Sequence, residues 1–187
     1  MIYGVVESTN SRATHYGERI FDCVCDKDVE NGMFGYMGEL RDKYTHIYNF
    51  VVGAPANGEK VCVIDQPAWD EDECRRSNQR RDKFYIPAGM PFRVRVVKET
   101  DEYAFNIMAF AEASRDKVEA VTDFVGTPVY VTIGADGKLV ASDAATDGAV
   151  MQGRIMRKRM VGDVLVTDVR TYGYNYALYT AKITALA

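Results

Sequence analysis

Apolar and polar residues alternate along much of the second half of the chain, which is the pattern of strands with one buried face. The alternating run TPVYVTI at residues 127–133 ends at GADG, residues 134–137, which is typical of a hairpin turn. The returning strand is expected at residues 138–142. Further strands in this half are expected at 150–160, 164–170 and 176–186.

The first half carries shorter and less regular strand signals, and the chain shows one convincing helix. The early strands are expected at residues 20–24, 33–37, 46–52, 60–64, 92–98 and 103–110. The helix is expected at residues 114–125, where Ser114 can cap the first turn and the valines fall on one face. Gly126 and Pro128 then provide a stop signal.

Two segments lack a core-forming pattern. Residues 1–20 show little apolar periodicity and carry Ser, Thr, Asn and Arg, which predicts an extended N-terminal arm. Residues 65–81 form a long charged connection that contains Pro67 and Trp69. A loop of that length within a compact domain is usually functional or ordered by a partner.

The predicted fold is mainly β, a β-barrel or β-sandwich-like architecture with one short α-helix. A chain of 187 residues, 47% of them hydrophobic, suits one domain or two small ones that share a core. We therefore expect a single β-rich domain at residues 21–187, with two β subdomains at 21–110 and 111–187 as the alternative.

Charge and hydropathy restrict the partners. The chain has 23 basic and 27 acidic residues, a net charge of -4, so its overall field disfavours nucleic acid. It has no stretch near the roughly 18 apolar residues of a membrane span, and its first residues lack the pattern of a secretion signal. We expect no membrane partner.

The four cysteines are expected to be free thiols, because no signal for secretion precedes them. Cys23 and Cys25 form a pair, with Cys62, Cys74 and His46 further along, which in principle supplies zinc ligands. Structural zinc sites usually take paired ligands on tight turns, whereas the one pair here lies in a strand-like segment. We therefore expect thiols buried as small hydrophobic groups, and no metal or cofactor.

No catalytic motif stands out. The two histidines, His15 and His46, lie outside any nucleophile motif, and the chain contains no nucleophile elbow, phosphate-binding loop or dinucleotide-binding glycine motif. The prediction is that the protein is not an enzyme.

The charged connection is the most unusual local feature. An acidic run at residues 70–73 is followed by the basic residues Arg75, Arg76, Arg80, Arg81 and Lys83. A second basic cluster comprises Arg154, Arg157, Lys158 and Arg159. One interpretation is a phosphate-binding strip with Trp69 or Tyr85 for stacking, and another is solvated charge neutralised locally. We favour a third, in which the opposite charges set the register between copies of the protein or with a protein partner.

A cluster of tyrosines, Tyr172, Tyr174 and Tyr176, has two equally weighted interpretations. Tyrosine is enriched at interface hot spots, so the cluster is a candidate contact site. Alternatively, the three rings lie on one face of a strand over the core.

Residues 127–155 resemble the central stretch of phage head decoration proteins of the lambda type. The similarity rests on the order of a Thr-Pro pair at 127–128, Lys-Leu-Val-Ala at 138–141 and Thr-Asp-Gly-Ala at 146–149, and covers about thirty of 187 residues. It implies a fold of the β-tulip type and a non-enzymatic virion protein, made in the host cytoplasm, that clamps the major capsid protein on the capsid exterior. Such proteins are often trimers with an extended arm.

The chain is much longer than the compact members of that family, and its first hundred residues lie outside the similarity. A minor capsid, head-fibre or tail component is therefore an alternative, as is a polyanion-binding β-domain that uses the basic cluster at residues 75–83. The predicted partners are the major capsid protein and copies of the chain itself. The predicted partner-contacting residues are Arg12, His15, Tyr16, Trp69, Asp70, Glu71, Arg75, Arg76, Arg80, Arg81, Tyr172, Tyr174 and Tyr176.

Overall fold

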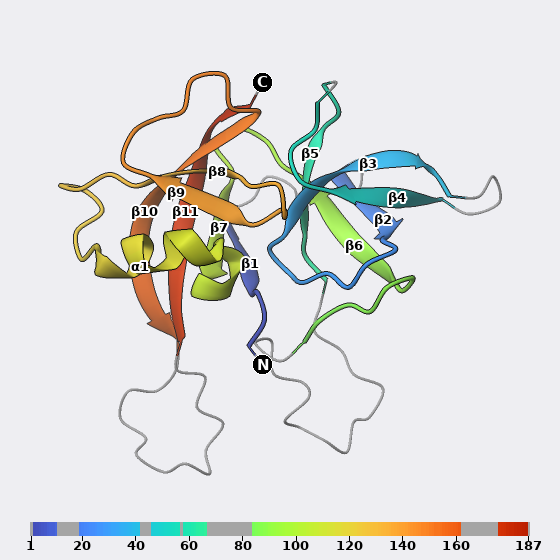
Figure 1. Cartoon of the computed structure of the whole chain (residues 1–187), viewed down its shortest axis with the longest axis horizontal. Helices are drawn as coiled ribbons and strands as arrows, with labels where there is room; N and C mark the ends of the chain where they lie inside the picture. The colour runs from blue at the N-terminus through green and yellow to red at the C-terminus, as the bar shows by residue number, and fades with distance from the viewer. Residues whose placement is uncertain are drawn as a thin grey trace, which may run out of the picture.

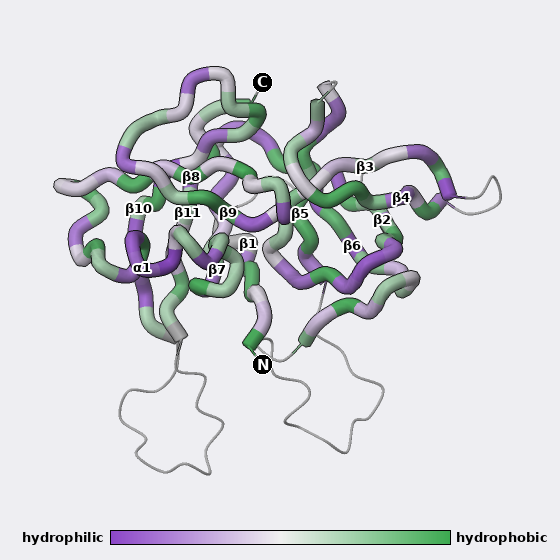
Figure 2. Tube along the Cα trace, in the orientation of Figure 1, coloured by the Kyte–Doolittle hydropathy of each residue, from purple (hydrophilic) through white to green (hydrophobic). Residues whose placement is uncertain are grey.

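The protein is mainly β, as the sequence predicts, and its strands form a closed five-stranded barrel beside a six-stranded sheet (Figure 1). The structure, a computed structural model, describes residues 2–10, 19–41, 46–56, 58–66, 84–161 and 176–186. Among these residues one α-helix, α1 (Glu112–Ala120), accompanies the sheet and is mostly hydrophilic (Figure 2). No helix in the described ranges is long and apolar enough to cross a membrane.

The barrel is built from five consecutive strands, which close in the order β2-β4-β3-β5-β6. Their bounds are β2 (Ile20–Val24), β3 (Phe34–Leu40), β4 (Ile47–Val52), β5 (Val61–Ile64) and β6 (Pro91–Val96). The strands pair antiparallel except for β2 and β4, which run parallel. The barrel interior includes Cys23, Phe50, Cys62, Phe92 and Val94.

The sheet combines the first strand of the chain with the last five, in the order β1-β7-β11-β10-β8-β9. Their bounds are β1 (Val6–Asn10), β7 (Glu102–Asn106), β8 (Tyr130–Ile133), β9 (Leu139–Ser142), β10 (Met151–Val161) and β11 (Tyr176–Leu186). All neighbouring strands pair antiparallel. Residues 127–155 contain β8, β9 and the start of β10.

One hydrophobic core joins the barrel to the sheet, and β5 shows how. All four residues of β5 are buried, which is typical of a strand covered on both faces. Cys62 and Ile64 point into the barrel, whereas Val61 and Val63 belong to the core shared with the sheet. The rings of Phe34 in the barrel and Phe105 in the sheet lie 5.7 Å apart in that core.

A buried ion pair also spans the junction. Arg19 precedes the barrel and donates to Asp101 Oδ2 over 2.5 Å, and its Nη2 donates to Val96 O over 2.9 Å. Asp101 precedes β7, and the same Oδ2 accepts from the backbone N–H of Lys98 and from the Tyr103 hydroxyl. Removing one member of such a pair leaves an uncompensated buried charge and typically costs about 3–5 kcal/mol.

The predicted hairpin turn at residues 134–137 is confirmed, and it docks on the barrel. Gly134 N–H donates to Lys138 O, and Gly137 adopts a φ of 74°. Phe34 N–H in turn donates to Gly137 O over 2.7 Å. A Cβ at Gly137 would lie 2.5 Å from Phe34 O, so glycine permits both the turn and the contact.

The helix lies earlier than the predicted range of 114–125. Ser114 is inside α1 rather than its cap, and its Oγ accepts the N–H of Ala141 over 3.0 Å. The helix ends at Ala120, where Val121 turns to an extended conformation, and beyond it the Asp123 side chain accepts the N–H of Val125.

The prediction of an extended arm at residues 1–20 is wrong for the first part of that segment. Residues 6–10 form β1, and Val5 and Val6 are buried, so this part belongs to the sheet. Likewise, β7 ends at Asn106 because residues 107–109 form a single 3₁₀ turn. Residues 11–18 and the predicted strand at 164–170 lie outside the described residues.

Candidate functional site

Nearly all the predicted partner-contacting residues lie outside the part of the chain that the structure describes. This holds for Arg12, His15, Tyr16, Trp69, Asp70, Glu71, Arg75, Arg76, Arg80, Arg81, Tyr172 and Tyr174. Tyr176 begins β11, but its side chain is also outside the description. These assignments therefore stay predictions, and the candidate site is built from other residues.

The described flanks of the charged connection lie beside the first residues of the chain. The side chain of Asn31 donates to Gln66 O over 2.9 Å and accepts from Gln66 N–H over 2.8 Å. Tyr85, half-exposed, stacks on Tyr3 with ring centroids 5.1 Å apart. Asn31 itself lies beside the first residues, since a Cβ at Gly4 would clash with Asn31 O. The structure thus brings both ends of the charged connection to the start of the predicted arm.

The cysteines Cys23, Cys25 and Cys62 are free and buried, as predicted for small hydrophobic groups. Burial raises the pKa of Cys23 to about 12, and the thiol of Cys62 and the carboxylate of Asp22 add to the shift. Burial also raises the pKa of Cys62 to about 12. Reactive thiols need a lowered pKa, so these two are suited to packing. Among the described residues, no group of three or more metal-ligating side chains is placed to hold an ion.

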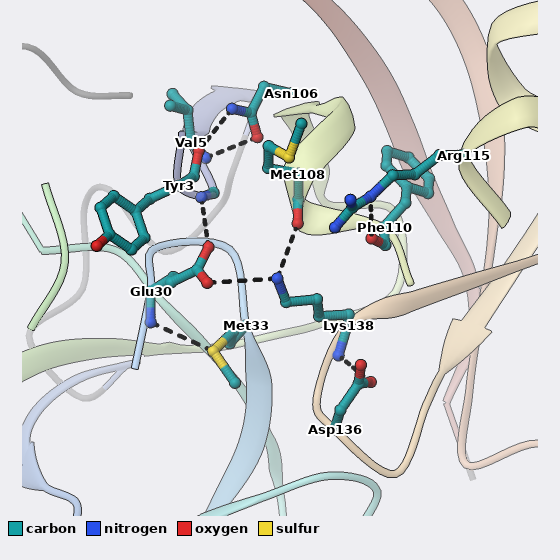
Figure 3. A network of polar contacts seen from close by, with 11 residues as sticks. Tyr3, Val5, Glu30, Met33, Asn106, Met108, Phe110, Arg115, Asp136 and Lys138 are labelled. Atoms are coloured by element: carbon teal, nitrogen blue, oxygen red, sulfur yellow. Dashed lines mark hydrogen bonds and ion pairs between the residues drawn. The ribbon is translucent and has the colours of Figure 1, made fainter. Parts of the chain in front are cut away.

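The first strand of the chain is anchored by side chains from the rest of the molecule (Figure 3). Asn106 Oδ1 accepts the Val5 N–H over 2.9 Å, and Asn106 Nδ2 donates to Tyr3 O over 2.8 Å. Glu30 Oε2 accepts the Gly4 N–H over 2.6 Å. Since Val5 and Val6 are also buried, β1 is fixed in place rather than frayed.

A lysine of the hairpin turn completes this network. Lys138 Nζ donates to Glu30 Oε1 over 3.3 Å and to Met108 O over 3.2 Å (Figure 3). The carboxylate of Glu30 therefore links the barrel, the start of the chain and the β8–β9 turn. Sequence reasoning missed Glu30 and Asn106, because a charged residue before a strand or an amide residue at a strand end has no local signal for a partner 26 or 101 residues away.

The outer side of β1 is an open sheet edge. Within the described residues β1 pairs with β7 on one side and with no strand on the other. Because Asn106 N–H donates to Val5 O, Val5 and Glu7 turn their backbone groups toward β7. Val6 and Ser8 turn theirs outward, and we call these outward backbone groups the β1 edge.

The opposite edge of the sheet is closed. Leu139 O of β9 accepts the Ala111 N–H over 2.9 Å, and Ala141 N–H donates to Ser114 Oγ. The start of α1 therefore occupies the hydrogen-bonding groups of β9, which is a common way to prevent strand addition. Within the described ranges, the protein protects one edge of this sheet and leaves the other exposed.

Basic side chains of β10 line up on one face of the sheet. Arg154, Arg157 and Arg159 pair with Lys182, Thr180 and Leu178, which are alternate residues of β11 and so share a face. A bulge between Ile155 and Arg157 brings Arg154 onto this face. We call the surface formed by Arg154, Arg157, Arg159 and Lys182 the arginine face. Simple alternation places Arg154 and Arg157 on opposite faces, so the arginine face could not be predicted from the sequence alone.

Comparison of the chain with protein-family models, with curated proteins and with solved structures gives no match in any of the three. The candidate functions below therefore rest on the geometry of the chain and on the local resemblance over residues 127–155.

Proposed function

We propose that this chain is a non-enzymatic structural protein that binds the outside of a phage capsid and clamps neighbouring capsid subunits. The observation that carries the proposal is the β1 edge, a strand anchored on one side and open on the other within the described residues. An extended segment of a partner can add to such an edge through main-chain hydrogen bonds.

The physical demands of a clamp agree with this arrangement. A fixed edge needs little ordering on binding, so more of the interaction energy is retained as affinity. On a closed shell, many weak contacts between clamps and subunits act together through avidity. The segment that resembles decoration proteins forms β8, β9 and part of β10, in the same sheet as the β1 edge.

The proposal is tested by a proline at the β1 edge. Ser8→Pro removes an N–H that points away from β7, and proline is tolerated on edge strands at such positions. We expect Ser8→Pro to keep the thermal stability of the unmodified protein but to lose co-sedimentation with shells assembled from the candidate major capsid protein. Undiminished co-sedimentation of Ser8→Pro would contradict the proposal.

Glu7→Pro is the matched control. It introduces the same residue one position earlier, where the N–H points toward β7. We expect Glu7→Pro to lower the melting temperature clearly, because it removes a ladder hydrogen bond; Glu7→Gln, which removes the charge of the pair with Arg159 but keeps the backbone N–H, should lower it less. Equal stability losses for the two prolines would show that the outward direction of Ser8 is wrongly assigned.

Association of the protein with itself is measured by light scattering at low and high salt. An oligomer that dissociates at high salt supports contacts between copies through opposite charges, since salt screening weakens exposed charge pairs. A monomer at every salt concentration would mean either that assembly needs the shell as a template or that the capsid proposal is wrong.

A further inference from the structure

Two charges of the arginine face, those of Arg154 and Arg157, have no carboxylate partner within the described residues, whereas Lys182 lies opposite Glu102 of β7. Arg157 is exposed, and its Nε donates to the hydroxyl of Thr180 over 3.4 Å. Arg154 donates weakly to the carbonyls of Phe124 and Val125, over 3.4 and 3.5 Å, and its Nε is buried with no partner in the described part of the chain. Over the same ranges, neither arginine forms an ion pair with a carboxylate.

An ion pair with an acidic residue forms at one end of this face. Arg159 forms an ion pair with Glu7 of β1, across the intervening strands β11 and β7. The pair lies on the same face as the buried cluster Val5, Ala104 and Leu178. The pair fixes one end of the face, whereas the exposed Arg157 is available to a partner and the partly buried Arg154 adds positive charge beside it.

We propose that the arginine face docks an acidic segment of a protein partner. A guanidinium matches a carboxylate through two parallel hydrogen bonds, and neighbouring arginines in a column can bind successive carboxylates. This is a second contact surface, distinct from the β1 edge.

Two observations favour an acidic protein over a nucleic acid. The net charge of -4 gives the molecule no long-range attraction for a long polyanion, so a local basic surface acts at short range. Met156, the bulge residue next to Arg157, is also exposed, with a relative exposure of 42%. Methionine is enriched in protein interfaces and adapts to irregular apolar surfaces.

The test measures binding of a short fluorescent oligoglutamate peptide by anisotropy, with an oligothymidylate of equal charge as the comparison. We expect Arg157→Gln to weaken peptide binding about tenfold, the effect of losing one charge-assisted hydrogen-bonded contact. Because Arg157 is exposed, the variant should keep its melting temperature. Ser8→Pro should bind the peptide as the unmodified protein does, which separates this proposal from the one on capsid binding.

Lys158→Gln is the control, since it removes one charge from the adjacent position on the other face, where Lys158 lies over the ring of Tyr179. It should leave peptide binding unchanged. An equal loss of peptide affinity in Arg157→Gln and Lys158→Gln would mean that the peptide responds to the overall charge of the protein, which would overturn the proposal. Absence of peptide binding would also overturn it. Tighter, Arg157-dependent binding of the oligothymidylate would overturn it in favour of nucleic acid.

Discussion

At the scale of single residues, burial decides what the side chains of the barrel can do. Cys23 and Cys62 combine a thiol with full enclosure among apolar neighbours, and burial raises the pKa of both to about 12. The thiols are therefore neutral at ordinary pH and contribute as small hydrophobic groups. The strand-like context of Cys23 allowed this to be predicted from sequence.

These raised pKa values predict a loss of stability in alkali. In the unfolded chain the thiols ionise near pH 9, whereas in the folded protein they ionise near pH 12, so the folded state binds more protons between these values. The free energy of unfolding should fall across this window by up to about 1.4 kcal/mol per pH unit for each thiol. Urea unfolding at a series of pH values measures the slope.

The double variant Cys23→Ala and Cys62→Ala is the control for this prediction. It retains the other titrating groups, including Tyr179, whose pKa burial also raises. Its unfolding free energy should fall less steeply above pH 9. The same slope in both proteins would assign the alkaline loss to other groups.

At the scale of elements, the sequence predicts most strands well, but it does not predict β1 or the pairing between strands. The predicted bounds 20–24 and 176–186 coincide with β2 and β11, because both segments are rich in apolar and β-branched or aromatic residues. β1 was missed because two buried valines are too few to show a period. The bulge that aligns the arginine face depends on the register with β11, which no local pattern contains.

The β8–β9 turn allows a test of how elements dock. Gly137→Ala would place a methyl group 2.5 Å from Phe34 O, in addition to the cost of a φ of 74°. Gly148 has a similar φ of 73°, but a methyl group there would meet no atom within 4 Å. We expect Gly148→Ala to cost about 1 kcal/mol, and Gly137→Ala to cost at least about 1–3 kcal/mol more.

Chemical unfolding of the two alanine variants provides the comparison. Since backbone strain is nearly the same at both glycines, the difference between the variants reports the docking contact with Phe34. Equal losses of unfolding free energy in the two variants would mean that the turn does not contact the barrel in solution.

At the scale of the whole molecule, the barrel and the sheet form one structure because they share a core. Val63 of the barrel packs in the same cluster as Phe105 of the sheet, and the Arg19–Asp101 pair joins their ends. The predicted alternative of two subdomains at 21–110 and 111–187 assigns β7 to the first unit, whereas β7 lies in the sheet between β1 and β11. It could not place β1 in the later unit, because that assignment depends on pairing with β7.

The shared core predicts that the two units unfold together. Val94→Ala removes two methyl groups from the barrel interior alone, which should cost about 2 kcal/mol. We expect native-state hydrogen exchange to show the same loss of protection for the slowest amides of β2–β6 and of β7, β10 and β11. A loss confined to the barrel strands would show that the units unfold independently.

The position of β11 in the sheet determines when the sheet can form during synthesis of the chain. The barrel strands are contiguous, so the barrel can close once residue 96 has left the ribosome. The sheet cannot be completed then, because its central strand β11 ends at Leu186. β1 pairs with β7 about a hundred residues later and stays at the margin of an unfinished sheet until β11 has been made.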